Sequence, residues 1–323
     1  MIVSRTKQIH FIFTDVFVRF VITGRKQKII QCRQRHLPEG IIVDGKINDF
    51  AALFSLMKNW MSENKIGSMQ ASFCIPDGQA IARRVSVPDT VPADEVKGHL
   101  YMEIGESIHL PFNDPILEVT DLRKMDLFGD VLFIATRESI VQEYSELLRK
   151  LKLEPVVADL TFLSVYRLAF KLDLVHDTRP VLLVQLNTNS LQLTIFQKHV
   201  PLYVHHSRLE EEISFDVKVN EDGNDVSVVP EHERESFFAG AHVTISSQIE
   251  RITSFFTYNI AKGSEEIQQM IVSGCHSLLH ELANELKNQL NIPLYVIDEK
   301  RLETITNHHF PSYFADCLGL AIK

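Results

Sequence analysis

The chain has 323 residues, which is enough for two domains of ordinary size or for one bilobed unit. Its formal net charge of -9 argues against a nucleic-acid-binding protein, because such proteins need clustered cationic surface. Hydrophobic residues make up 45% of the chain, a fraction typical of globular proteins, but no run approaches the roughly 20 apolar residues of a transmembrane helix. With no sign of a signal peptide at the N-terminus, the sequence predicts a protein that is neither exported nor membrane-spanning.

The N-terminal region begins with patterns typical of strands. Residues 9–13 form an apolar run, and apolar residues then alternate from 16 to 22 before a third strand-like stretch near 28–33. A helix is predicted over 50–61, because its apolar residues recur at intervals of three and four. A short strand over 71–75 follows and ends at a Pro-Asp-Gly turn.

The second half repeats this order of elements. A buried-strand run over 181–186 is followed by a turn and by alternating apolar residues from 191 to 195. Each half therefore reads as a strand meander followed by helix and strand units, which predicts two α/β lobes. The remaining predicted elements of this half are a strand at 202–204, a helix at 245–260, a strand at 270–272, a leucine-rich helix at 278–290 and a strand at 294–297.

Two segments depart from the repeated plan. Residues 79–155 predict a small α+β unit inserted in the first lobe. Residues 211–240 are polar and charged, with a turn signal at Asp222 and Gly223, and we expect them to form a variable, solvated tip of the second lobe. The predicted elements of the insertion are strands near 83–87 and 131–136 and helices near 94–104 and 139–151.

Several segments, taken in order, resemble those of a known protein family. Residues 37–47 resemble the stretch before the first long helix, and residues 73–88 resemble the strand that leads into an inserted subdomain. Ser273 and Gly274 resemble a turn that contacts adenosine, and Asp316–Ala321 resembles the helix that closes the fold. The matching segments are spread over nearly the whole chain, and their order carries the resemblance, which is to the PilM family of type IV pilus assembly proteins.

The resemblance implies an actin-like (ribonuclease H-like) two-lobed α/β fold with a small α+β subdomain inserted in the first lobe. The first lobe is expected over 1–178 with the insertion at about 79–155. The second lobe is expected over 179–307 with a variable tip at about 211–262, and a closing helix over 308–323 is expected to return to the first lobe.

In function, the resemblance implies a cytoplasmic scaffold of a pilus assembly machine. Such a scaffold binds the cytoplasmic N-terminal tail of PilN, a single-pass membrane protein, in a groove beside the insertion, and it connects to other assembly components. It would lie at the inner face of the membrane only through that partner. The alternative is a nucleotide-dependent actin-like ATPase or filament-forming protein of the FtsA type, or a sugar kinase of the same architecture.

The positions that would bind nucleotide in this family depart from the family pattern. Asp15 matches the acidic residue of the first phosphate hairpin, but no Gly, Ser or Thr follows it closely, and Phe17 is expected where the phosphates would lie. Gln185 and Asn187 stand where the second hairpin has Asp and Gly, and glutamine lacks the carboxylate that helps to hold hydrated Mg²⁺. In the adenosine turn, Gly274 is followed by cysteine instead of a second glycine.

Three departures together predict a degenerate ATPase that is not an enzyme, with ATP and Mg²⁺ bound weakly or not at all. Asp15 also has a plain structural interpretation, in which it is a carboxylate at a strand end that bonds to backbone groups.

Other residues capable of chemistry give weaker patterns. The adjacent histidines at 205–206 and 308–309 predict no metal site, because neighbouring side chains on a strand point to opposite faces. The four cysteines have no Cys-x-x-Cys spacing, so we expect reduced thiols that are not essential, as suits a cytosolic protein. They are Cys32, Cys74, Cys275 and Cys317.

Overall fold

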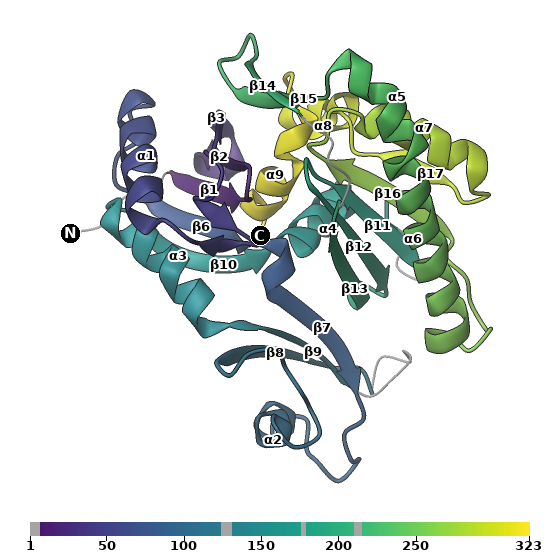
Figure 1. Cartoon of the computed structure of the whole chain (residues 1–323). Helices are drawn as coiled ribbons and strands as arrows, with labels where there is room; N and C mark the ends of the chain where they lie inside the picture. The colour runs from purple at the N-terminus through teal and green to yellow at the C-terminus, as the bar shows by residue number, and fades with distance from the viewer. Residues whose placement is uncertain (1–6, 124–130, 176–178, 210–214) are drawn as a thin grey trace.

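The computed structural model describes residues 7–123, 131–175, 179–209 and 215–323. Two lobes face each other, each built on a five-stranded mixed sheet (Figure 1). None of the helices in these ranges is long and apolar enough to cross a membrane.

The first lobe contains a sheet in the order β10-β6-β1-β2-β3. Its central strands are almost wholly buried because their apolar residues face helices on one side and the closing segment of the chain on the other. The strands are β1 (Gln8–Phe13), β2 (Phe17–Thr23), β3 (Ile29–His36), β6 (Gln70–Ile75) and β10 (Glu154–Leu160), and the helices are α1 (Phe50–Glu63), α3 (Glu138–Lys150) and α4 (Thr161–Lys171).

The second lobe repeats the strand order of the first, as β13-β12-β11-β16-β17. In both lobes an antiparallel meander of three strands is extended by two strands that lie parallel to its first strand, so the prediction of two lobes with one pattern is confirmed. Its elements are β11 (Val181–Leu186), β12 (Ser190–Gln197), β13 (Val200–Arg208), α5 (Glu231–Ala239), α6 (Ala241–Phe255), β16 (Gln269–Gly274), α7 (Leu279–Gln289), β17 (Leu294–Val296) and α8 (Glu299–Thr306).

The inserted unit is shorter than predicted. It consists of an antiparallel sheet in the order β7-β9-β8 with one helix and a small core of its own. The predicted boundary near 155 lies too late, because α3 buries Tyr144 and Leu147 in the first lobe's core and β10 pairs with β6. The elements of the insertion are β7 (Ala80–Val85), α2 (Val96–Glu103), β8 (Pro115–Asp121) and β9 (Val131–Arg137).

The polar tip of the second lobe is not only solvated. Strands β14 (Asp216–Val219) and β15 (Asp225–Val228) form a hairpin that reaches over to the edge strand β3 (Figure 1). The side chain of Asn224 accepts a hydrogen bond from the Gln34 amide at 2.9 Å, and Asp225 accepts one from the His36 amide at 2.8 Å. The hairpin therefore ties the second lobe to the first and covers part of an otherwise open sheet edge.

Helix α9 (Ala315–Ala321) closes the fold by packing against α4 and the first sheet. The two helices approach closely at Gly319, where a Cβ atom would lie 2.0 Å from the Ser164 carbonyl oxygen. Inside this junction the buried Arg19 forms an ion pair with Asp316 at 3.3 Å and donates a hydrogen bond to the Tyr313 carbonyl. The helices α4 and α9 therefore form a tightly packed joint between the lobes.

Within the described residues, three hairpin turns have two consecutive residues in the left-handed region. The β4–β5 hairpin (Ile42–Val43 and Lys46–Ile47) uses Asp44 and Gly45, the pair that this turn favours. The β2–β3 turn instead uses Lys26 and Gln27, and the β12–β13 turn uses Lys198 and His199, all four with φ between 48° and 64°. A left-handed conformation costs a residue with a Cβ atom about 1–2 kcal/mol, so these two turns are strained.

Candidate functional site

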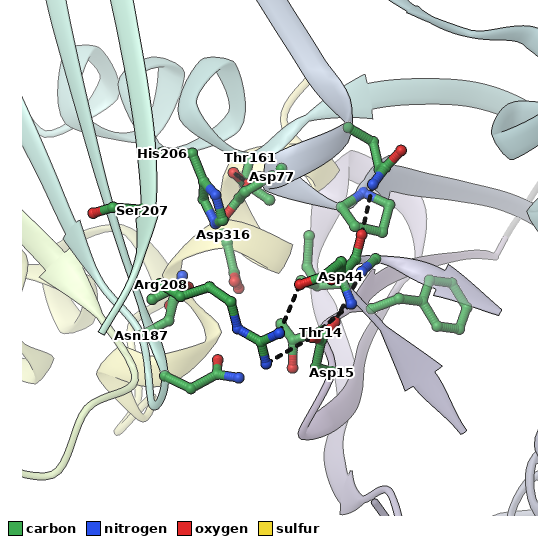
Figure 2. A pocket seen from close by; sticks show the side chains of 18 residues that line it. Thr14, Asp15, Asp44, Asp77, Thr161, Asn187, His206, Ser207, Arg208 and Asp316 are labelled. Atoms are coloured by element: carbon green, nitrogen blue, oxygen red, sulfur yellow. Dashed lines mark hydrogen bonds and ion pairs between the residues drawn. The ribbon is translucent and has the colours of Figure 1, made fainter. Parts of the chain in front are cut away.

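A cleft of about 350 Å³ lies between the two lobes, at the edge where the central strands end. Turns from both sheets line it, together with the first residue of α4 and the second residue of α9 (Figure 2). Its volume is within the range of small-molecule sites. The polar residues that line it include Thr14, Asp15, Asp44, Asp77, Thr161, Asn187, His206, Ser207, Arg208 and Asp316.

Asp15 is fully engaged by neighbouring groups of the protein. Its two carboxylate oxygens accept hydrogen bonds from the backbone amides of Asp44 and Gly45, each at 2.9 Å. Arg208 reaches across from the second lobe and lies 3.5 Å from Asp15 and 2.6 Å from Asp44 (Figure 2). Asp15 therefore acts here as a carboxylate that holds a hairpin turn and an interlobe ion pair.

Thr14 occupies the amides of the β1–β2 turn. Its hydroxyl oxygen accepts hydrogen bonds from the amides of Val16 at 3.3 Å and Phe17 at 2.9 Å, and it donates to the Phe17 carbonyl at 3.0 Å. A phosphate-binding hairpin needs such amides to be free, because they supply the donors for the phosphate oxygens. This turn instead satisfies them with its own side chain.

Phe17 lies elsewhere than predicted. Its ring is buried and packs edge-on against His36, with ring centroids 5.8 Å apart, instead of facing the cleft. The reason is the strand register. Phe17 lies directly opposite His36 in the β2–β3 ladder, so the two side chains point to the same face of the sheet.

Two of the other three predicted site residues lie apart from Asp15. Gln185 and Gly274 line a separate cavity of only about 10 Å³, which is too small for a nucleotide, and Asn187 lies at the border of both hollows. Gln185 is 3% exposed and faces Gln192 of the neighbouring strand, so it lies within the sheet and not on the wall of the cleft. The structure thus brings together only Asp15 and Asn187 of the four.

Gly274 has a structural requirement for glycine. Its φ is 142°, and a Cβ atom would lie 1.8 Å from the Leu186 carbonyl oxygen. That same oxygen accepts hydrogen bonds from the amides of Cys275 at 3.1 Å and His276 at 3.3 Å. The turn after β16 therefore uses its amides to bind β11. All four cysteines of the chain are free, and Cys74 and Cys317 are buried.

The base of the cleft carries acidic groups that the sequence analysis did not single out. Burial raises the pKa of Asp77 from 3.8 to about 7, although a hydrogen bond from the Thr161 hydroxyl opposes the shift. Burial also raises the pKa of Asp316, while Arg19 lowers it. No local pattern marks these residues, because they converge from three distant parts of the chain. Among the described residues, no group of three His, Cys, Asp or Glu side chains is arranged to hold a metal ion.

The raised pKa of Asp77 predicts a pH dependence of stability. The folded protein holds this proton up to about pH 7, whereas the unfolded chain releases it near pH 3.8. The free energy of unfolding should therefore fall as the pH rises through that window, by at most about 1.4 kcal/mol per pH unit. Urea unfolding at several pH values should show this slope, and Asp77→Asn should flatten it. Equal slopes for the variant and the parent would contradict the assignment.

Comparisons with known proteins agree with this architecture. The sequence profile of the family "Type IV pilus assembly protein PilM" matches residues 17–310. Among solved structures, a "PilM-PilN type IV pilus biogenesis complex" is similar with a TM-score of 0.76 and 21% identity, over 98% of both chains. No curated protein sequence matches the chain.

Two further structures share the fold at lower similarity. The ethanolamine utilization protein EutJ from Carboxydothermus hydrogenoformans has a TM-score of 0.52 and 10% identity, over 98% of this chain and 89% of EutJ. MreB 5 of Spiroplasma citri, bound to AMPPNP, has a TM-score of 0.50 and 9% identity, over 98% and 95% of the two chains. The predicted actin-like fold is therefore confirmed, and the chain belongs to the PilM family of type IV pilus assembly proteins.

Proposed function

We propose that this protein is a cytoplasmic scaffold of a type IV pilus assembly machine, and that it binds the cytoplasmic N-terminal tail of a PilN-like membrane protein. The solved relative with the same fold over 98% of both chains is a complex of PilM with PilN, which supports this choice of partner. The protein would reach the inner face of the membrane through that tail, together with other assembly components.

We further propose that the interlobe cleft is a degenerate nucleotide site. The observation that carries this proposal is the double engagement of Asp15 by Arg208 and by two backbone amides. The carboxylates of Asp15 and Asp44 line the cleft, and they would repel a triphosphate. The fold would thus be kept for its shape, with ATP and Mg²⁺ bound weakly or not at all and no catalytic role.

Mg-ATP should accordingly fail to stabilise the protein. A ligand present at 100 times its dissociation constant stabilises the folded state by about 2.7 kcal/mol, which a thermal-shift titration detects readily. We expect no such shift at submillimolar Mg-ATP, and a titration with Mg²⁺ alone controls for ionic effects. A saturable shift of that size would instead support the alternative, a nucleotide-dependent actin-like ATPase or filament-forming protein.

The candidate site for the tail is a groove of about 600 Å³ on the first lobe, beside its junction with the insertion. Phe50 and Ile47 from the first lobe and Ile140 from α3 supply its apolar residues. Arg137, at the junction with the insertion, donates a hydrogen bond to the Pro111 carbonyl at 3.3 Å. The groove therefore lies in the first lobe and reaches the insertion at Arg137, and we name it the insertion groove. Its other lining residues are Lys46, Ser139, Gln142, Glu143, Glu146 and Lys150.

The free edge of the insertion's sheet is a less suitable place for the tail. The hydroxyl of Tyr101 accepts a hydrogen bond from the Leu117 amide at 3.2 Å and donates one to the Pro115 carbonyl at 3.4 Å. These are the backbone groups of β8 that an added strand would have to pair with. A tail that added to this edge would first displace Tyr101, so we favour the insertion groove.

A further inference from the structure

A second groove, of about 530 Å³, lies at the joint between the lobes. The last turns of α4 form one wall, and the end of α9 contributes Ile322. The β2–β3 turn contributes Gln27 and the β12–β13 turn contributes His199. We call this hollow the hinge groove.

The hinge groove lies at the opposite end of the joint from the interlobe cleft. Thr161, the first residue of α4, lines the cleft, whereas Phe170 near the end of that helix lines the groove. Likewise, Asp316 at the start of α9 lines the cleft, and Ile322 at its end lines the groove. A rise of about 1.5 Å per residue separates the ends of α4 by about 15 Å, so the two hollows are distinct sites.

The floor of the hinge groove is apolar and aromatic. Tyr166 stacks on Phe196 with ring centroids 3.7 Å apart, and Phe170 meets the His199 ring edge-on at 5.2 Å. Phe170 nevertheless remains 52% exposed, which is high for a large aromatic residue beside other rings. An exposed aromatic residue at a concave surface is typical of protein-recognition sites.

The rim of the hinge groove is basic although the whole chain is acidic. Lys171 and Arg167 line it, and Lys26 and Lys28 flank the lining residue Gln27. Arg167 and Lys323 form ion pairs with the same carboxylate, that of Asp159. The distances are 2.5 Å from Arg167 and 3.3 Å from Lys323. The surface around the groove therefore has a positive charge that would attract an acidic ligand.

The two hairpin turns at the hinge groove are the strained ones. Lys26 and Gln27 in one turn, and Lys198 and His199 in the other, adopt a conformation that suits asparagine and glycine. The Asp44 and Gly45 turn on the cleft side has the favourable pair. The β2–β3 and β12–β13 turns occupy equivalent places in the two lobes, and both lie at the hinge groove. Backbone strain in both turns indicates that their side chains serve recognition.

We propose that the hinge groove binds a short segment of another protein in which apolar side chains are flanked by acidic ones. The apolar residues would lie on Tyr166 and Phe170, and the acidic residues would pair with Lys171 and the lysines of the β2–β3 turn. The concave floor fits a peptide better than a bilayer, which would need a protruding apolar face. This partner is separate from the PilN-like tail, which we place in the insertion groove.

Fluorescence anisotropy with two labelled synthetic peptides tests the proposal on the full chain. The acidic peptide EELFDLE should bind, and the charge-reversed peptide KKLFKLK should bind at least tenfold more weakly. Phe170→Ala and Lys171→Glu should each weaken binding of EELFDLE at least tenfold, because one removes the apolar contact and the other reverses the charge. Tyr258→Ala and Lys300→Glu are matched controls at exposed positions of the second lobe. Both should leave the binding of EELFDLE unchanged.

Two outcomes would overturn the proposal. One is that neither peptide binds, or that binding of EELFDLE is unchanged in both hinge-groove variants. The other is that vesicles containing phosphatidylglycerol bind the protein, through Phe170 and Lys171, while the peptides do not, which would assign the surface to a membrane.

A further variant that combines Lys26→Asn with Gln27→Gly tests the role of the strained turn. It should raise Tm by relieving strain and should also weaken the binding of EELFDLE. A turn with a merely structural role would not produce both effects.

Discussion

A Gly274→Ala variant should be destabilised by more than about 4 kcal/mol, which exceeds the effect of ordinary substitutions. The added Cβ atom would lie 1.8 Å from the Leu186 carbonyl oxygen, which is backbone in the centre of the second sheet and cannot move aside. The residue would also have to keep a φ of 142°, which side chains rarely adopt. Chemical denaturation followed by circular dichroism measures the loss.

Gly98→Ala is the matched control for this prediction. Gly98 lies in α2, and a Cβ atom there would meet nothing within 4 Å. Because alanine favours helices over glycine, this variant should be stabilised by about 0.5–1 kcal/mol. If Gly274→Ala had the same stability as the parent, the turn would tolerate a Cβ atom, contrary to the structure, and Gly274 would be free for a different role.

A Ser139→Trp variant should weaken binding of the PilN-like tail about 100-fold, which corresponds to about 2.7 kcal/mol. Ser139 is exposed in the first turn of α3 and lines the insertion groove, so the indole would occupy space that the tail needs. The tail should bind the parent with a micromolar constant, about -8 kcal/mol, because ordering a disordered segment offsets part of the contact energy. Calorimetry with a synthetic tail peptide measures both values.

Arg149→Trp is the control on the same helix, since Arg149 is exposed and does not line the insertion groove. It should leave tail affinity unchanged, as should Phe170→Ala in the hinge groove. A point variant is a better test than deleting residues 79–155, because α3 and β10 carry part of the first lobe's core and sheet. Unchanged affinity in Ser139→Trp would exclude the insertion groove as the site of the tail.

The repeated lobes could be predicted from the sequence because each strand and helix carries its own local periodicity. The alternation from 16 to 22 and the stripe of apolar residues over 50–61 became β2 and α1. Helix α3 was predicted over 139–151 but assigned to the wrong unit. Its apolar stripe shows that one face is buried, while the surface that covers it depends on the tertiary fold.

The contents of the cleft were less predictable, because they depend on contacts between distant residues. Asp15 has its partners 29, 30 and 193 residues away, at Asp44, Gly45 and Arg208. The contact of Asn224 with β3 spans 190 residues and joins the lobes in a similar way. Thr14 is the exception: a threonine just before a tight hairpin often bonds to turn amides, and that local signal was present in the sequence.

Calorimetric titration of the full chain with the tail peptide, with and without millimolar Mg-ATP, tests the central claim most directly. If the protein's own groups already occupy Asp15 and the turn amides of the interlobe cleft, and the protein acts by binding a partner, the tail should bind with one micromolar constant in both conditions. Mg-ATP alone should give no saturable heat. Submillimolar binding of Mg-ATP, or tail binding that appears only when nucleotide is present, would contradict the account.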